Sequence, residues 1–376
     1  MNFGLSEEQS RQAEALAALL EDDGGGLEAP PASRIGPLLQ RWWPELGQLG
    51  LLQPAGPSRV ARMAAGKKLA ERAPWLVFGA EMTRLVARLI DRAAGPAQTE
   101  LAGFGAELAA GRKLAAAAVT ELGRSSDAAG LDTRAAATDG GYRLEGAKEQ
   151  VSLAPICDRL AVLAAGEQGP LVLLVDPHMR GVDIGQPMDA LGYHELLTCP
   201  VHFAGVEVAA ADALGPFDPQ QQADVGQWLR RSEDAVLTAN ALGLMQRCLD
   251  EACRAATAAR GGGKPAAAHQ LVRFDLAEML TQLQTAELLA LRAAAAADAG
   301  ERRADELALC AKVFATEAAC TVSDQALGIL AAAGYRRDHP VARALMQARF
   351  GPLAGHGSHA ARMAIADAVL ARLAPG

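Results

Sequence analysis

The sequence predicts an α+β protein that is mostly α, with an N-terminal helical domain, a small middle β-sheet domain and a C-terminal four-helix bundle. Near both ends of the chain apolar residues recur every three or four positions, which is typical of helices facing a core. Between these regions they alternate or form short runs, which is typical of strands. The chain has 376 residues, half of them hydrophobic, which is more than one core usually holds. We therefore predict domains at residues 1–113, 114–221 and 222–376.

The N-terminal domain carries two clear helical signals. Ser6 precedes the run EEQSRQAEALAALL, which has acids in its first turn, so Ser6 fits the N-cap position of a helix. The segment GAEMTRLVARLIDRAA repeats apolar residues at steps of three and four. Stretches rich in Gly and Pro at 23–31 and 52–57 interrupt these patterns. We expect helices separated by turns in this domain.

The middle domain is built from short apolar segments bounded by Gly, Pro or Asp. Examples are GYRLEGAKEQVSL, DRLAVLAAG, PLVLLVDP and CPVHFAGVEV. Their length and spacing are those of strands joined by tight connections. We expect a compact antiparallel sheet.

The C-terminal domain is helical from about residue 222 to the end. Its long Ala/Leu-rich segments are separated by breakers such as the glycines at 261–263, and four long helices with short connections predict a bundle. Alanine favours helix formation, so we expect residues 331–333 to continue the third helix. The four predicted helices span residues 222–259, 265–297, 302–333 and 356–373.

The charge balance excludes some classes of partner. The formal net charge is −8, from 36 basic and 44 acidic residues, and the basic residues form no cluster that would neutralise phosphates, so we expect no nucleic-acid binding. No apolar run is long enough to span a bilayer, and the N-terminus has no pattern of a signal peptide. We expect a cytoplasmic protein without a membrane span. The six cysteines form no Cys-x-x-Cys pair, so we expect neither disulfides nor a thiolate metal site.

Short motifs follow one another in a fixed order along the chain. In the middle domain they are TELGRSSD at 120–127, LEGAK at 144–148, FAGVEV at 203–208 and LG at 214–215. In the bundle they are LGLMQ at 242–246, HQ at 269–270, LAEM at 276–279 and GY at 334–335 before PV at 340–341. With these motifs the sequence resembles the acyl-CoA dehydrogenase family over nearly its whole length.

The resemblance implies an FAD-dependent oxidoreductase that desaturates an acyl-CoA thioester between its α and β carbons, as in fatty acid β-oxidation. In this family a carboxylate removes the weakly acidic α-proton while FAD accepts hydride from the next carbon. An apolar pocket raises the pKa of such a carboxylate and makes it a useful base. The resemblance also implies an external electron-transfer flavoprotein as oxidant of the flavin, and a homodimer or homotetramer.

The base is implied at Glu233. Most relatives place it in a Glu-Gly-Thr motif near the C-terminus, where this sequence has Gly355, His356 and Gly357, so that glutamate is absent. A minority place the base near the start of the first bundle helix, ten residues before the glycine that matches Gly243, and this position is Glu233.

From the residues alone, a purely structural interpretation of Glu233 stays open. An acid at the start of a helix, flanked by Arg230, Arg231 and Asp234, fits a solvated surface position equally well. The sequence also departs from the family here, since relatives often have Arg directly after the acid and this chain has Asp234.

The resemblance also assigns the flavin contacts. At the ring end they are Val119, Thr120, Ser126 and Ser152. At the dinucleotide end they are His269 and Gln270, with Arg260 one position from the family's arginine. A Gly-Gly pair of the family is replaced by Ala331 and Ala332, which adds methyl groups where backbone and ligand meet.

Two other functions remain open from the sequence. One is a non-catalytic or half-site partner subunit of a heteromeric acyl-CoA dehydrogenase, paired with a homologous chain. The other is a flavin-free acyl-CoA binder. For an active enzyme, Gly262 and Gly355 each replace a larger residue, and we expect a cavity widened toward bulky, ring-bearing acyl groups.

Overall fold

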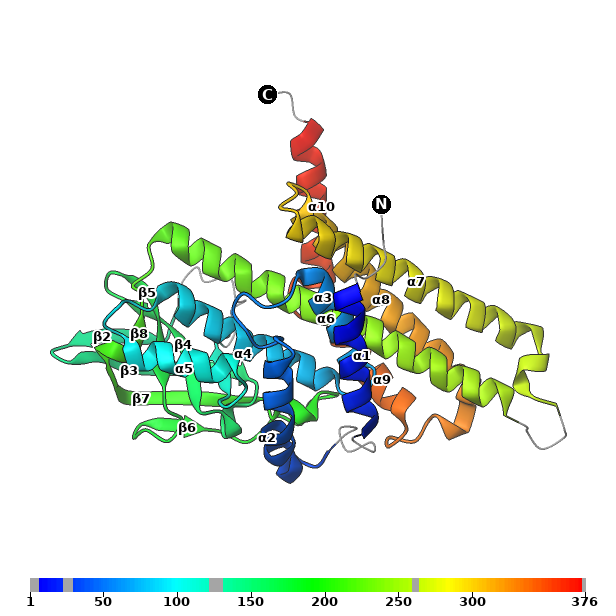
Figure 1. Cartoon of the computed structure of the whole chain (residues 1–376), viewed down its shortest axis with the longest axis horizontal. Coiled ribbons are helices and arrows are strands. Elements are labelled where there is room, and N and C mark those ends of the chain that lie inside the picture. Colours follow the sequence, from blue (N-terminus) through cyan, green and yellow to red (C-terminus); the bar gives the residue numbers. More distant parts are fainter. Residues whose placement is uncertain (1–6, 23–29, 122–130, 259–263, 374–376) are drawn as a thin grey trace. The chain divides into compact units, whose positions relative to one another are not determined.

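The computed structural model describes residues 7–22, 30–121, 131–258 and 264–373 (Figure 1). The chain divides into two compact units. The first unit contains Met1–Glu28, Ser58–Val77 and Arg230–Gly376, and the second contains Ala29–Pro57 and Phe78–Leu229. Helices from the first 113 residues belong to both units. The three domains predicted from the sequence stay a prediction.

The first unit is helical. Four of its helices, α6, α7, α8 and α10, correspond to the predicted bundle segments, α1 and α3 come from the N-terminal part of the chain, and the short helix α9 was not predicted. Pro340 occupies the first turn of α9, and the His339 side chain caps it by accepting from the Val341 N–H at 3.2 Å. The helices are α1 (Glu7–Asp22), α3 (Arg59–Ala70), α6 (Pro219–Thr257) from Arg230 onward, α7 (Gln270–Asp298), α8 (Ala304–Leu330), α9 (Pro340–Ala348) and α10 (Ser358–Leu373).

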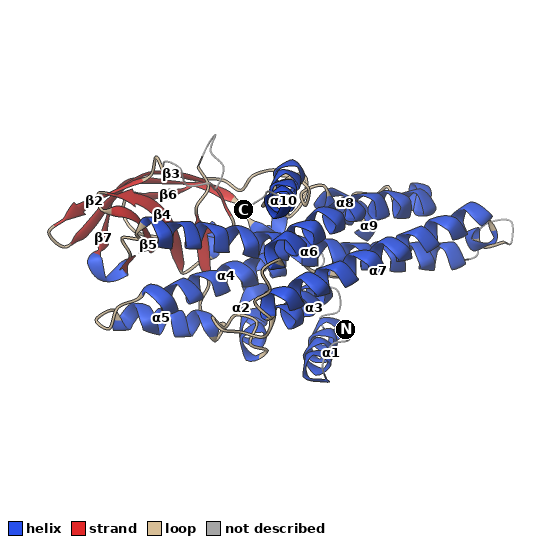
Figure 2. Cartoon of the chain, turned by 90° about the horizontal axis from the view of Figure 1, so that it is seen from above, coloured by secondary structure: helices blue, strands red, loops and turns tan. Residues whose placement is uncertain are grey.

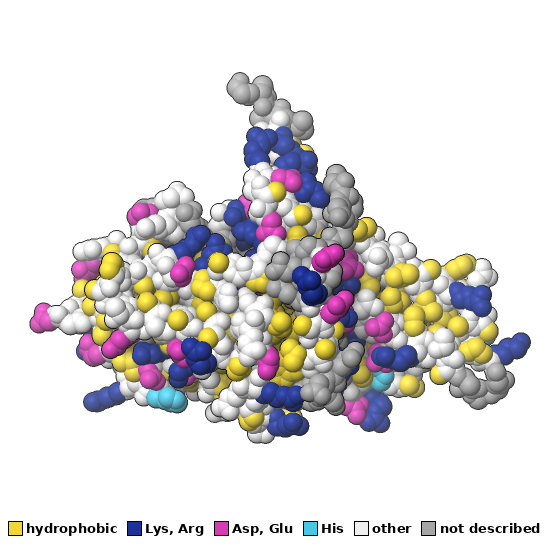
Figure 3. Space-filling view, viewed as in Figure 1, with side chains coloured by type: hydrophobic (Ala, Val, Ile, Leu, Met, Phe, Trp, Pro, Cys, Tyr) yellow, Lys and Arg dark blue, Asp and Glu magenta, His cyan; other side chains and the backbone are white. Residues whose placement is uncertain are grey.

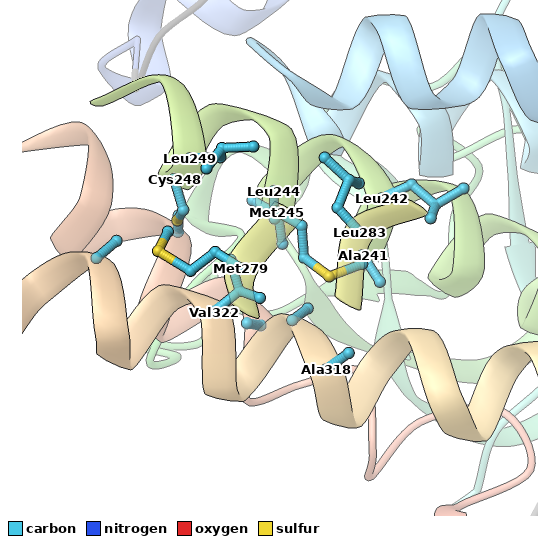
Figure 4. Close-up of a cluster of buried hydrophobic side chains, with 14 of the residues drawn as sticks. Ala241, Leu242, Leu244, Met245, Cys248, Leu249, Met279, Leu283, Ala318 and Val322 are labelled. Carbon is cyan, nitrogen blue, oxygen red and sulfur yellow. The ribbon is translucent and has the colours of Figure 1, made fainter. Parts of the chain in front are cut away.

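The core of the first unit lies among α6, α7 and α8 (Figure 4). Larger apolar side chains fill it, and many fully buried alanines let the helices approach closely. Side chains with an exposed fraction of 1% or less include Met245, Cys248, Met279, Leu283 and Val322.

Gly243, within the 242–246 motif, permits a close helix crossing. A Cβ atom on this residue would lie 2.5 Å from the Cβ of Ala70 and 2.6 Å from the backbone oxygen of Lys67. Lys67 also pairs with Glu287 on α7 at 2.8 Å. The glycine is therefore required for the packing of α3 in the first unit.

The second unit contains an eight-stranded sheet (Figure 2). Along it the order is β6-β7-β3-β2-β4-β5-β8, and β1 pairs with β4. The strands are β1 (Ala115–Ala118), β2 (Arg134–Thr138), β3 (Gly141–Val151), β4 (Arg159–Gly166), β5 (Gly169–Val175), β6 (Val182–Ile184), β7 (Cys199–Ala209) and β8 (Ala213–Leu214).

The prediction of an antiparallel sheet was wrong in part, because the sheet is mixed. Most neighbouring strands are antiparallel, but β1 runs parallel to β4, and β2 meets β4 in parallel at Arg134 and Ala165. Alternation of apolar residues indicates a strand but not its partner. The β1–β4 pairing joins Ala115 to Arg159, far apart in sequence, and no local pattern reports it. The mostly α, α+β fold class is confirmed.

The second unit also contains helices, and two of them, α4 and α5, pack against the sheet. The helices are α2 (Ala32–Gln48), α4 (Pro74–Ala93) from Phe78 onward, and α5 (Thr99–Ala109). One buried cluster combines Ile90 of α4 and Leu101 of α5 with Leu163 of β4 and Leu174 of β5. These contacts bury one face of β4 and β5 and hold the end of β1 in place.

The surface mixes charges of both signs. On the face shown in Figure 3, acidic and basic side chains are interspersed. Two ion pairs join α10 to α8, Arg362 with Glu317 at 2.6 Å and Arg372 with Glu306 at 2.5 Å. Among the described residues, no helix combines the length and hydrophobicity needed to cross a membrane.

The prediction that residues 331–333 continue the third bundle helix was wrong. Helix α8 ends at Leu330, and Ala331 has φ 52° and ψ −135° before a 3-10 turn over residues 331–333. The chain folds back because Gly334 is buried against Leu330, where an added Cβ would lie 2.7 Å from the Leu330 Cβ. Residue type did not predict this end, since alanine itself favours helix.

We predict that Ala331→Gly raises the free energy of unfolding. The φ of Ala331 lies in the region that favours glycine, so removing its Cβ relieves strain of about 1 kcal/mol. Denaturant unfolding measures the change. The matched control is Ala332→Gly in the same turn, where φ is not positive and only flexibility of the unfolded chain is gained. Equal loss of stability in both variants would contradict the prediction.

Candidate active site

Glu233 and Asp234 are consecutive residues on α6, and neither is a solvated surface acid. Glu233 is half-buried and Asp234 is 3% exposed. Burial raises the pKa of Glu233, and the adjacent Asp234 charge raises it further. The nearby backbone of Gly355 and the charges of Lys312 and His356 partly offset this rise. Glu233 therefore keeps its proton up to a higher pH than a solvent-exposed glutamate does.

Asp234 holds the loop between α9 and α10. Its Oδ1 accepts the backbone N–H of His356 at 2.9 Å, and its Oδ2 lies 2.6 Å from the Nδ1 of the same residue. Gly355 has φ 60°, and a Cβ there would lie 2.5 Å from Asp234 Oδ1. The turn thus needs glycine both for its backbone conformation and for the approach of the carboxylate.

Lys312 of α8 reaches the same loop from within the core. Its side chain is fully buried, and its Nζ donates to the backbone oxygen of His356 at 2.5 Å. Burial lowers the pKa of Lys312, while the negative charges of Asp234, Glu233 and Glu317 oppose that shift. Two acids, one amine and one imidazole therefore meet where α6, α8 and the 355–357 loop come together.

Sequence reasoning identified Glu233 but missed its partners. Asp234 and His356 are 122 positions apart, and no local pattern connects them. Lys312 could have been recognised from the sequence. It stands in the apolar run Ala311-Lys312-Val313 of a core helix, where a charged residue indicates a buried partner.

In the second unit, Val119 and Thr120 follow β1 and are fixed against β3. The fully buried Lys148 donates to the backbone oxygen of Val119 at 3.1 Å and to Glu121 Oε1 at 2.7 Å. The Glu149 N–H donates to the backbone oxygen of Thr120 at 2.8 Å. Both Val119 and Thr120 stay half-buried, so their positions are held by the ends of β1 and β3.

Glu121 is the anchor of this arrangement. Burial alone would raise its pKa, but hydrogen bonds from Lys148 and from the Asp132 and Thr133 backbones lower the pKa to about 2. The two backbone bonds are 2.7 and 3.0 Å long. Both carboxylate oxygens are thus satisfied inside the fold.

The remaining predicted cofactor residues are spread over both units. Ser152 follows β3, is half-buried, and its Oγ lies 3.2 Å from Thr198 Oγ1. His269 and Gln270 are exposed at the start of α7, with His269 as the N-cap residue. Ser126 and Arg260 lie outside the described residues. Across the described ranges, no group of three or more His, Cys, Asp or Glu side chains could hold a metal ion.

Known proteins share both parts of this architecture. The family model for the acyl-CoA dehydrogenase C-terminal domain matches residues 232–370, and that for the middle domain matches residues 116–206. Benzylmalonyl-CoA dehydrogenase of Aromatoleum aromaticum is 33% identical over 262 residues, 69% of either chain. The 3-(aryl)acrylate reductase of Clostridium sporogenes is 33% identical over 270 residues, 69% of this chain and 70% of that protein.

The fold is also that of solved structures. Glutaryl-CoA dehydrogenase from Mycobacterium smegmatis superposes with a TM-score of 0.85 at 21% identity, over 97% of this chain and 95% of that chain. The matched C-terminal and middle domains and this fold place the chain in the class of acyl-CoA dehydrogenase-like proteins. The chain belongs to the acyl-CoA dehydrogenase family.

We predict that Gly355→Ala destabilises the protein by about 2 kcal/mol, because it forces a side chain into a positive φ and against Asp234. Thermal and denaturant unfolding report the loss. Gly357→Ala is the control, since the atom nearest to its added Cβ would be the Leu353 backbone oxygen at 3.4 Å and its φ is not positive. If both variants are equally stable, the strain at Gly355 is absent.

We also predict an acid-dependent contribution from Glu121. Its folded pKa of about 2 lies below its ordinary value of 4.5, so its stabilisation is present above pH 4.5 and is lost as the pH falls toward 2. Glu121→Gln should remove this pH dependence and cost about 3 kcal/mol near neutral pH, because it leaves Lys148 buried without its counter-charge.

Unfolding measured between pH 7 and pH 3 tests this contribution of Glu121. Glu145→Gln on β3 is the control, since the Glu145 side chain is 54% exposed and pairs with an exposed Arg143. A Glu121→Gln protein that loses stability with acid as steeply as wild type would refute the prediction.

Proposed function

We propose that this chain is an FAD-dependent acyl-CoA dehydrogenase in which Glu233 removes the α-proton of the thioester substrate. One observation carries the proposal. Asp234, next to Glu233, bonds His356 at 2.9 and 2.6 Å, and this brings the backbone of Gly355, the residue that stands where most relatives have their catalytic glutamate, close to the Glu233 carboxylate. The acid supplied by the helix thus lies beside the loop that supplies the acid in those relatives.

The chemistry matches the environment of Glu233. An α-proton beside a thioester carbonyl is weakly acidic, so the base must have a high proton affinity and still be ionised in the resting enzyme. Burial and the neighbouring Asp234 raise the pKa of Glu233, while Lys312, His356 and the Gly355 backbone limit the rise. These neighbours hold the carboxylate in place and restrict its hydration. The carboxylate oxygen of Glu233 then receives the proton. FAD, when bound, supplies the acceptor for the hydride that leaves the β carbon.

The described residues fit a flavin in two respects. Val119, Thr120 and Ser152 are half-buried and held by the strand ends, as ring contacts must be, and His269 and Gln270 leave exposed polar groups at the start of α7. Ala331 keeps a backbone conformation that glycine prefers, and residues 331–333 are exposed, so the added methyls do not fill a core. We assign Ser126 and Arg260 to the same cofactor site on the resemblance alone.

The names of two relatives support a class of substrate for this chain. A benzylmalonyl-CoA dehydrogenase and a 3-(aryl)acrylate reductase both carry names of aromatic substrates, which supports a ring-bearing acyl group for this chain. Gly355 keeps side-chain volume out of the loop beside Glu233. We further propose an electron-transfer flavoprotein as the oxidant, a homodimer or homotetramer as the assembly, and the cytoplasm as the location.

We predict that Glu233→Gln leaves a yellow, folded protein whose flavin bleaches about 10² to 10⁴ times more slowly with an acyl-CoA, because an amide cannot take the α-proton. Visible absorption before and after added FAD shows cofactor binding, and anaerobic stopped-flow mixing with an aryl-substituted acyl-CoA measures the bleaching. Glu306→Gln is the control, an acid on α8 that is paired with Arg303 and belongs to no part of the cluster around Glu233. Unchanged bleaching in Glu233→Gln would exclude Glu233 as the base.

The replacement of the family's Gly-Gly pair by Ala331 and Ala332 favours one second candidate, a non-catalytic subunit that pairs with a homologous chain. The same preparations distinguish it. A colourless protein that takes up no FAD and co-purifies with a homologue carrying the intact motifs supports the subunit. A colourless protein that binds a CoA ester alone indicates a flavin-free acyl-CoA binder.

A further inference from the structure

The pair formed by Asp234 and His356 is not explained by proton removal at Glu233. Both oxygens of Asp234 are used by one residue, His356, through its backbone N–H at 2.9 Å and its Nδ1 at 2.6 Å. A carboxylate that binds backbone and ring together fixes both the position of the loop and the orientation of the imidazole. With Asp234 only 5% exposed at its side chain, these two bonds lie mostly out of competition with water.

His356 is held from a second side. The fully buried Lys312 donates to its backbone oxygen at 2.5 Å, so the N–H, the carbonyl and the ring of one residue are all bonded. The backbone of Gly355, directly before it in the chain, lies close enough to Glu233 to act on its carboxylate. The position of that backbone therefore depends on the bonds that Asp234 and Lys312 make to His356.

The charges around Glu233 are nearly balanced. The groups that act on it are Asp234 from its own helix, Lys312 from α8 and His356 from the loop. Glu317, also on α8, acts on Lys312 and is itself paired with Arg362 of α10. Because Asp234 and Lys312 offset each other, a protonated His356 leaves the four-group cluster neutral with Glu233 ionised. A neutral His356 leaves it with one negative charge.

We propose that Asp234 and His356 form a positioning dyad for Glu233, in which Asp234 holds the 355–357 loop against α6 beside Glu233 and the imidazole sets the net charge of the cluster around Glu233. Sites coupled in this way titrate together, and the coupling acts equally in both directions. The role of the dyad in turnover rests on the proposed function. Its coupling to Glu233 is a property of the folded chain and is measured without substrate.

The first test is an NMR pH titration of the histidine rings in the wild type and in Glu233→Gln. The variant keeps the shape of the side chain but removes a negative charge, so protonated His356 loses stabilisation. We expect the titration midpoint of His356 to fall by about half a pH unit or more. The signals of the other histidine rings are the internal control. An unchanged His356 midpoint overturns the proposal.

The second test separates the clamp from the charge. In His356→Asn the side-chain amide can replace Nδ1 as donor to Asp234 but carries no charge, whereas His356→Ala loses both. We expect His356→Asn to unfold near the wild-type temperature and to shift the acid limb of the bleaching rate upward by about half a pH unit, because Glu233 loses a positive neighbour. His356→Ala should unfold at lower temperature and bleach more slowly at every pH.

The outcomes distinguish this proposal from the proposed function. If the two His356 variants have the same stability and the same pH profile, the clamp is refuted. If Glu233→Gln shifts the His356 midpoint but still bleaches at the full rate, the coupling is supported and Glu233 is excluded as the base. If the protein takes up no flavin, the NMR titration still decides the coupling.

Discussion

The candidate site of the helical unit depends on the bonds between Asp234 and His356. They bring a loop from near the C-terminus onto α6, 122 positions away in sequence, and place the backbone of Gly355 near Glu233. Lys312 stabilises the same loop from α8, and its burial is tolerated because acids surround it. Without this junction, α6 would carry an acid at its surface with no partner from α8 or the loop.

The second unit depends on a comparable junction of opposite charges. Glu121 and Lys148 tie the segment after β1 to β3, and the same carboxylate accepts the backbones of Asp132 and Thr133. The two junctions differ in their electrostatics. At Glu121 burial raises the pKa, but the hydrogen bonds together outweigh burial and lower it. At Glu233 burial outweighs the opposing contributions and the pKa is raised. An acid of the first kind is a structural anchor, and an acid of the second kind is suited to receive a proton.

Periodicity predicted the elements of this fold better than their ends and partners. The long helices and most strands follow from the spacing of apolar residues, but the parallel pairing of β1 with β4 and the turn at Ala331 are set by tertiary contacts. At the site, resemblance pointed to Glu233, Val119 and Thr120. It was silent on the dyad, because Asp234 and His356 occupy positions where the family carries other residues and only folding brings them together.

The left-handed turn at Gly355 has an evolutionary consequence. A glutamate restored there, as most relatives have it, would meet both an unfavourable φ of 60° and the Asp234 oxygen 2.5 Å from its Cβ. A single substitution that moves the acid back from helix to loop therefore carries a cost in stability in this chain. A smaller residue at Asp234 would remove the steric part of that cost, so the two distant positions are linked in evolution.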